Sequence, residues 1–277
     1  MKKTIAAALV AASLLSLAAC QKPAASGGNA GSGNASASAG GIDGTWKADL
    51  ATVQIDSKPD QLLLQDGKYS CSTCAPPLEV AADGAFHPVT GRAYSDAFSV
   101  KADDDHNVTM TSQKDGKVME VDKLSVSDDG KTLTTSFTDS SVPNKPVTGS
   151  YTETRVADAP KGAHAISGSW KMDKYNDVSD EALTTTFALN GDTLHMSSPT
   201  GQSYDAKLDG TAAPINGDKG GTTASVKKTG DNVYQETDTL KGKVVGVMTT
   251  TVDGDTLHVV SENKLSGSTM KYDMKRT

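Results

Sequence analysis

Two cysteines form the one arrangement in the sequence with the spacing of a redox or metal site: Cys71-Ser72-Thr73-Cys74. Such a pair can be a structural disulfide, a redox-active pair or part of a metal site. A thioredoxin-like redox site needs the pair at a helix within a βαβ unit, whereas the residues here predict a hairpin. Haem attachment needs histidine where Ala75 stands, and zinc needs two more ligands. We expect a disulfide between Cys71 and Cys74 that rigidifies a local turn, and the redox-active pair and the metal site remain alternatives.

The other side chains with catalytic potential are scattered. The acidic run Asp103-Asp104-Asp105 falls between two expected strands and lacks the glycine bend and alternating ligands of a calcium loop. Neither a GxSxG elbow nor a phosphate-binding glycine loop is present. We expect no enzymatic activity, no cofactor and no bound metal, although a triad built from distant segments is not visible in a sequence. The histidines show neither HExxH nor paired spacing, and they are His87, His106, His164, His195 and His258.

The first residues have the layout of an export signal. Lys2 and Lys3 precede an apolar run over residues 5–18, which is broken only by Ser13 and Ser16. This run is shorter than the roughly 20 apolar residues that a transmembrane helix needs. We therefore expect a signal peptide that is removed after export.

The end of this segment, Leu17-Ala18-Ala19-Cys20, resembles the lipobox of bacterial lipoproteins. The resemblance implies a signal peptide over residues 1–19 and a lipid anchor on Cys20; the alternative is an ordinary secretory peptide with a chance cysteine. In proteobacterial lipoproteins an aspartate after the cysteine favours retention in the inner membrane, and Gln21 stands here. The resemblance therefore implies a location at the cell outer membrane, facing the periplasm. This compartment is oxidising, which favours the Cys71–Cys74 disulfide.

Residues 20–41 predict a flexible, disordered linker behind the lipid. The stretch after Cys20 is composed almost entirely of Gly, Ala, Ser and Asn and has no large apolar side chain. Removal of Lys2 and Lys3 with the signal peptide takes away two positive charges and changes the formal net charge from −7 to −9. Because acidic proteins repel polyanions, we expect no nucleic acid partner, and contact with the membrane through the lipid alone.

An internal repeat divides the rest of the chain. Gly44-Thr45-Trp46-Lys47 matches Gly168-Ser169-Trp170-Lys171 at an offset of 124 residues. We expect a first β-domain at 42–157, a linker at 158–165 and a second β-domain at 166–277. Further matches follow in the same order at offsets of 124 to 126: Asp83-Gly84 with Asp209-Gly210, Ser99-Val100-Lys101 with Ser225-Val226-Lys227, Gly116-Lys117-Val118 with Gly242-Lys243-Val244, and Asp129-Gly130 with Asp253-Gly254.

Alternation of apolar and polar residues predicts that both domains are all-β. Phe98, Val100 and Ala102 alternate with polar neighbours, as do Leu194 and Met196. No long window shows the spacing of an amphipathic helix. Hairpin signals recur at Asp66-Gly67, Asp129-Gly130, Asn190-Gly191 and Asp253-Gly254. Short strands joined by sequential hairpins predict two tandem antiparallel meanders, each an up-and-down barrel or a strongly curled sheet.

Each copy opens with Gly-x-Trp and ends in a strand that finishes with arginine, which resembles the lipocalin pattern. In that family the arginine of the last strand packs across the tryptophan and closes one end of the barrel. The resemblance implies a Trp46–Arg155 pair in the first copy and a Trp170–Arg276 pair in the second. The alternative is that the tryptophans are ordinary core aromatics and the arginines are exposed chain ends.

The repeated segments also resemble uncharacterised bacterial envelope proteins with tandem β-domains. The likeness rests on Gly44 to Lys47, on Asp83-Gly84 with Pro88 to Gly91, and on Gly116 to Val118 with Asp129 to Thr134. It implies a family without an assigned activity. We therefore keep two function classes open: a module that binds a small apolar ligand in or near a barrel, and a non-enzymatic interaction or structural protein that contacts another envelope protein.

Overall fold

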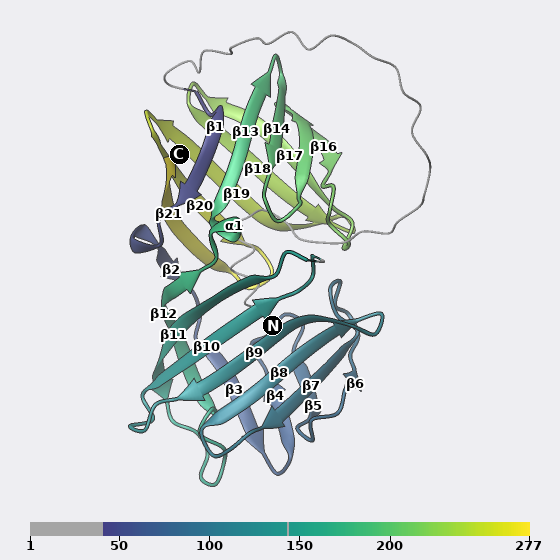
Figure 1. Ribbon diagram of the computed structural model, residues 1–277, viewed down its shortest axis with the longest axis vertical. Helices are drawn as coiled ribbons and strands as arrows, with labels where there is room; N and C mark the ends of the chain where they lie inside the picture. Colours follow the sequence, from purple (N-terminus) through teal and green to yellow (C-terminus); the bar gives the residue numbers. More distant parts are fainter. Residues whose placement is uncertain (1–40, 143) are drawn as a thin grey trace.

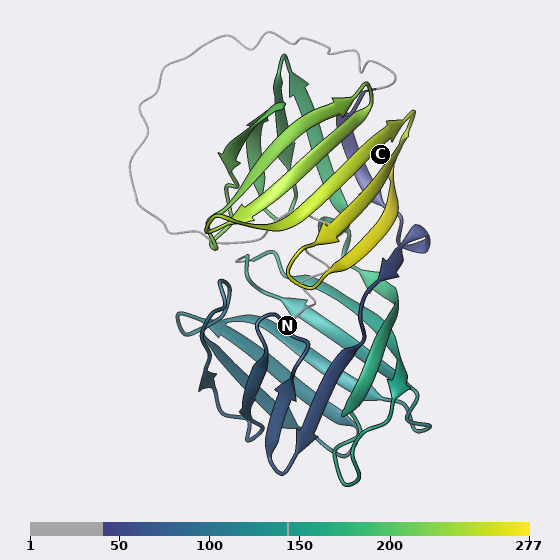
Figure 2. The same ribbon diagram turned by 180° about the vertical axis from the view of Figure 1, so that it is seen from behind.

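The computed structural model describes residues 41–142 and 144–277. The expected signal peptide, the lipidated Cys20 and the linker as far as residue 40 lie outside the described residues. Within the described part, two antiparallel sheets curl into nearly closed barrels, as Figures 1 and 2 show. The all-β, two-barrel prediction is therefore confirmed. None of the helices in this part is long and apolar enough to cross a membrane.

The first barrel is a 10-stranded sheet in the order β5-β4-β3-β12-β11-β10-β9-β8-β7-β6. All of its strands come from one continuous stretch of the chain. They are β3 (Asp60–Gln65), β4 (Lys68–Cys71), β5 (Leu78–Ala81), β6 (His87–Pro88), β7 (Ala97–Ala102), β8 (Asn107–Lys114), β9 (Lys117–Val126), β10 (Thr132–Asp139), β11 (Val147–Ala157) and β12 (Gly168–Val178).

The second barrel is an 11-stranded sheet in the order β15-β14-β13-β1-β21-β20-β19-β18-β17-β16, with β2 paired to β21. It combines the two ends of the described chain. Its strands are β1 (Gly44–Ala48), β2 (Gln54–Asp56), β13 (Thr184–Asn190), β14 (Thr193–Ser197), β15 (Ser203–Lys207), β16 (Asp209–Pro214), β17 (Thr222–Gly230), β18 (Val233–Leu240), β19 (Lys243–Asp253), β20 (Thr256–Asn263) and β21 (Ser268–Arg276).

The first strand of each sequence repeat lies in the barrel of the other repeat. β1 pairs with β13 and β21 of the second barrel, whereas β12 pairs with β3 and β11 of the first. β12 follows β11 in the chain and pairs with it in the first barrel. The second barrel therefore lacks a strand between β13 and β21, and β1 occupies this position. The sheets and the sequence repeats therefore have different boundaries, and the chain crosses between the barrels at η1 (Leu50–Thr52) with β2 and again at α1 (Asp180–Leu183).

Tight turns join the sequential strands as the sequence predicts. In the β3–β4 hairpin, Asp66 and Gly67 have φ angles of 50° and 71°, the positive values that a two-residue turn of type I′ needs. Gly130, Gly191 and Gly254 also have positive φ angles. These glycines allow the meander to reverse at short intervals, because glycine adopts this backbone region without steric cost.

The two barrels lie end to end (Figures 1 and 2). β1 and β12 both begin at an outer end of the molecule and run toward the junction, where η1, β2 and α1 lie. Hydrogen bonds join the barrels at this junction: Tyr94 Oη donates to Asp218 Oδ1 over 2.8 Å, and Lys145 Nζ donates to the Pro199 carbonyl over 2.8 Å. The inner ends of the barrels therefore face each other.

Candidate functional site

Trp46 and Trp170 close the outer ends of the two barrels. Both side chains are fully buried. The guanidinium carbon of Arg276 lies 4.0 Å from the centre of the Trp46 ring, and that of Arg155 lies 4.0 Å from the centre of the Trp170 ring. The stacking that the lipocalin-like pattern implies is present, but the partners are exchanged. The expected pairs Trp46–Arg155 and Trp170–Arg276 do not form, because β1 and β12 each complete the barrel of the other copy.

The two closures are built from matching contacts. Trp46 Nε1 donates to the Ile42 carbonyl over 2.8 Å, and Trp170 Nε1 donates to the Ile166 carbonyl over 2.7 Å. At Gly44 an added Cβ would lie 2.5 Å from the guanidinium of Arg276, so glycine is required for the arginine to approach. These contacts fill and cap the outer ends of the two barrels.

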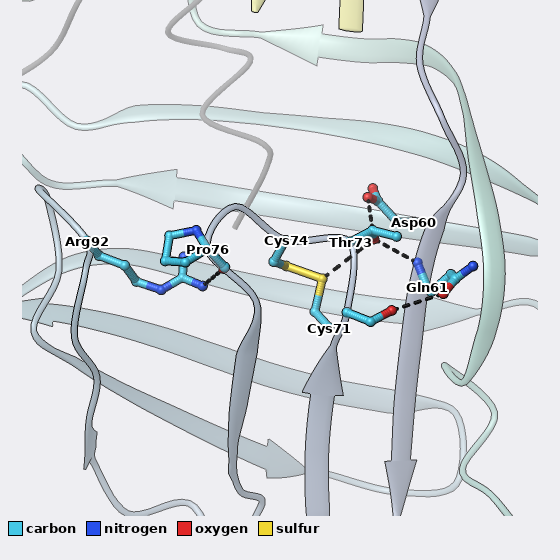
Figure 3. The surroundings of a disulfide bond; sticks show 8 residues. Asp60, Gln61, Cys71, Thr73, Cys74, Pro76 and Arg92 are labelled. Carbon is cyan, nitrogen blue, oxygen red and sulfur yellow. Dashed lines mark hydrogen bonds between the residues drawn. A yellow bond between two sulfur atoms is a disulfide. The ribbon is translucent and has the colours of Figure 1, made fainter. Parts of the chain in front are cut away.

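The predicted Cys71–Cys74 disulfide is present, with the two Cα atoms 5.4 Å apart (Figure 3). It fixes a turn after β4. The Thr73 hydroxyl in this turn accepts from the Gln61 backbone amide over 3.0 Å and donates to Asp60 Oδ1 over 3.3 Å. The bridge therefore ties the turn to β3, as the sequence predicts for a structural disulfide.

Both cysteines are buried, and their sulfurs face the inside of the first barrel rather than solvent. They line a chamber of about 50 Å³, defined here by Asp60, Tyr69, Cys71, Cys74, Met110, Glu120, Asp122, Thr135, Tyr151 and Glu153 with two leucines. Four of these residues carry carboxyl groups, and among the described lining residues there is no lysine, arginine or histidine. The chamber is therefore strongly acidic.

Burial and mutual repulsion shift the pKa values of residues that line the chamber and of Asp139 beside it. The pKa of Glu120 is raised well above its ordinary value, mainly by burial and then by the nearby carboxylates of Asp122 and Asp139. Burial also raises the pKa of Asp139 and that of the Tyr151 phenol. A positive charge entering this region would stabilise the ionised carboxylates, because opposite charges favour the charged forms of both partners.

A larger central cavity of about 460 Å³ lies between the inner ends of the barrels, lined by residues of both. Glu120 lines both spaces. The first barrel contributes apolar side chains, Phe98 and Met119, with Tyr94 beside them, and the second barrel contributes Leu240, Val245 and Leu265. A volume of this size lies within the range of small-molecule sites, about 300–1,000 Å³.

Charged groups of opposite sign line this cavity. Glu120 and Asp139 come from β9 and β10 of the first barrel, whereas Lys241 and Lys243 come from the β18–β19 hairpin of the second. Arg92 lies beside Phe98, with its guanidinium carbon 5.4 Å from the ring centre, and donates to the Pro76 carbonyl (Figure 3). The cavity can therefore offer apolar contact, a negative region and a positive region to one ligand.

The interior of the second barrel is filled by its own side chains. Tyr204 donates to Glu236 Oε2 over 2.7 Å, and both residues are buried. The remaining space beside Glu236 is about 10 Å³, room for no more than a single water. The two homologous barrels therefore differ in the space left open inside them.

The histidines and the acidic run do not assemble into a catalytic or metal site in the described part of the chain. His87, His195 and His258 pair with surface aspartates at 2.7 to 2.9 Å. Asp104 caps its own loop by accepting from the backbone amides of His106 and Asn107. Across the described residues, no group of three or more His, Cys, Asp or Glu side chains is placed to hold a metal ion.

Sequence reasoning missed the acidic chamber, although a signal for it exists. Glu120 and Asp122 occupy alternate positions on the face of β9 that carries Leu124 and Val126, and that face is otherwise apolar. Two carboxylates on a core-facing set of strand positions indicate a polar interior. The opposing lysines could not be found in this way, because they belong to the other repeat.

Comparisons of the chain with protein-family models, with curated proteins and with solved structures find no match.

Proposed function

We propose that this protein is a lipid-anchored, periplasm-facing lipoprotein of the cell outer membrane that binds a small ligand in the central cavity between its barrels. The observation that carries the proposal is the cavity of about 460 Å³, whose lining comes from both barrels. The adjoining chamber extends it into the first barrel. Such a site surrounds a ligand on several sides, which is typical of small-molecule binding proteins.

The lining favours an amphipathic ligand over the purely apolar one expected from the sequence. Phe98, Met119 and Leu240 supply apolar contact. Glu120 and Asp139 would remain next to a bound apolar group, and burial of unpaired carboxylates costs free energy. A ligand with both an apolar part and a polar part would satisfy this lining better.

The attachment point of the linker supports a role at a membrane surface. Arg276 Nη2 donates to the carbonyl of Gly41 over 3.0 Å, which fixes the first described residue at the closed outer end of the second barrel. The proposed anchor on Cys20 would therefore hold the molecule by this end. The central cavity lies at the opposite end of the same barrel and would be accessible to ligands in the periplasm.

The proposal is tested by extracting the protein from membranes and measuring its mass under native conditions. We expect a bound small molecule that is released on unfolding. Ala93→Trp, which places a large side chain on the cavity wall, should abolish its retention, whereas Ala85→Trp on an exposed loop should not. A ligand-free native chain that instead co-precipitates with an envelope protein would contradict the proposal and support the interaction or structural alternative.

A further inference from the structure

We propose that the central cavity selects a zwitterionic molecule, with its ammonium group held by the carboxylates of the first barrel and its anionic group held by the lysines of the second. This inference rests on the proposed binding function and names the chemical class of the ligand. It follows from the separation of charges across the cavity, from their lack of pairing with one another and from a comparison of the two barrels.

The negative side of the cavity is built into the first barrel. Glu120 of β9 and Asp139 of β10 are directly opposite each other in the antiparallel register. Like charges at opposing strand positions destabilise a sheet. An ammonium group between the two carboxylates would relieve this repulsion, and the tyrosine rings of the adjoining chamber offer further favourable contact to a cation.

The positive side comes from the second barrel and from one loop of the first. Lys241 lies in the turn of the β18–β19 hairpin and Lys243 begins β19, and both side chains line the cavity that the first barrel also lines. Arg92 lies on the same cavity wall as Phe98 and donates to a backbone carbonyl. These groups would hold a carboxylate or a phosphate at the entrance.

The two charged sides do not neutralise each other. Among the ion pairs between described residues, none joins Arg92, Lys241 or Lys243 to Glu120 or Asp139. Because no ion pair between described residues joins the two sides, one ligand that spans the cavity could contact both. A ligand with a single charge would satisfy only one side.

The second barrel shows that the fold does not require these carboxylates. Its counterpart of the Glu120–Asp139 pair is Gly246 opposite Asn263, at the same register position of β19 and β20. The counterpart of Asp122 is Met248. The second barrel has no charge at these two paired positions and carries the carboxylates Glu236 and Asp238 on the neighbouring strand β18 instead. The paired strands therefore do not require the Glu120–Asp139 pair, which lines the central cavity.

The test is calorimetry on the lipidated full chain with four probes of similar size: 6-aminohexanoate, hexylamine, hexanoate and 1-hexanol. We expect 6-aminohexanoate to bind most tightly, by about tenfold over each singly charged probe. Glu120→Gln should weaken the binding of 6-aminohexanoate and of hexylamine but leave the binding of hexanoate unchanged. The double change Lys241→Gln with Lys243→Gln should weaken the binding of 6-aminohexanoate and of hexanoate but leave the binding of hexylamine unchanged.

Matched controls separate these effects from general changes in charge. Two residues outside the cavity lining serve for this purpose: the exposed Glu79 of β5, and Lys264, whose side chain pairs with Glu262. Glu79→Gln and Lys264→Gln should leave all four affinities unchanged. Binding of 1-hexanol as tight as that of 6-aminohexanoate would overturn the zwitterion inference while leaving a binding function intact. Failure of all four probes to bind at about 10 mM would also overturn it, and the native mass measurement would then decide separately whether the cavity holds a ligand.

Discussion

At the scale of single residues, the buried carboxylates of the first barrel are the most informative feature of this protein. Asp122 and Glu153 are almost completely buried, and Glu120 lies with them at the opening of the chamber. Interior positions of a small barrel normally hold apolar side chains, because a carboxylate loses solvation there. Ionisable groups with shifted pKa values cluster at functional sites, which favours a role in binding for the carboxylates that line the open chamber.

The first prediction concerns the effect of Glu120 on stability. Its pKa is raised in the folded state, so the folded chain binds its proton more tightly than the unfolded chain. The free energy of unfolding should therefore fall as the pH rises from the ordinary glutamate value of about 4.3 through the raised folded-state value. Glu120→Gln should raise the melting temperature at pH 8 and leave it nearly unchanged at pH 4, as measured by calorimetry. An equal effect at both pH values, or the same result for Glu79→Gln, would contradict the argument.

The second prediction concerns the disulfide. Replacing both Cys71 and Cys74 with alanine opens a very short loop, so we expect a loss of about 1–2 kcal/mol in the free energy of unfolding. Denaturation in urea measures this loss, with Ser72→Ala in the same turn as the control. Because both sulfurs line the chamber, ligand binding should weaken as well. A variant with native stability and native binding would show that the bridge does not shape the site.

At the scale of secondary structure, the exchange of first strands organises the molecule. β1 supplies Trp46 to the second barrel, and β12 supplies Trp170 to the first. Each of these strands lies between two neighbours and completes a nearly closed sheet, which protects strand edges that would otherwise pair with other chains. The exchange also means that the chain crosses between the barrels twice, at η1 with β2 and at α1. The relative position of the two barrels therefore depends on both crossing segments.

The third prediction follows from this exchange. Trp46→Ala should cost about 3–5 kcal/mol, because it leaves a cavity at the closed end of the second barrel. Hydrogen exchange should show loss of protection in β13 and β21, with β3 and β11 still protected. Trp170→Ala should give the opposite pattern. Loss of protection in the barrel of the same repeat would contradict the exchanged arrangement.

The fourth prediction tests the same arrangement by cross-linking. Thr45 of β1 and Thr186 of β13 lie opposite each other, with their hydroxyl oxygens 2.9 Å apart. Cysteines at both positions should form a disulfide within one chain, detectable by peptide mass mapping after oxidation. A pair placed at Thr45 and Gln61 of β3, the residue that faces Ser169 of β12, should stay reduced. The reverse outcome would place β1 in the first barrel.

At the scale of the whole molecule, two barrels with closed outer ends and facing inner ends make one binding unit. Neither barrel alone supplies the full lining of the central cavity. Tyr94 holds the junction through Asp218 and through the Thr222 hydroxyl, 3.0 Å away. The site therefore needs both barrels, since Glu120 and Asp139 come from the first and Lys241 and Lys243 from the second.

The fifth prediction concerns the anchor. Cys20→Ser should prevent lipidation and release the chain from the membrane fraction into the soluble periplasmic fraction after cell fractionation. A single acyl chain gives marginal membrane binding, and several chains are needed for stable attachment. The released chain should still bind 6-aminohexanoate, because the cavity is far from Gly41. Continued membrane association of the Cys20→Ser variant would contradict a lipid anchor as the basis of attachment.

The sequence by itself determined the all-β class, the tandem repeat, the hairpin turns and the disulfide. These features depend on local patterns: alternation along one strand, glycine at a turn and two cysteines three residues apart. Sequence patterns also identified the four residues that stack at the barrel ends. They could not identify which tryptophan meets which arginine, because both copies offer the same surfaces to β1 and β12. Only the tertiary structure decided this pairing, through the chain connection that keeps β12 beside β11. It also decided the site, since Glu120 and Lys241 approach the same cavity only when the inner ends of the two barrels face each other.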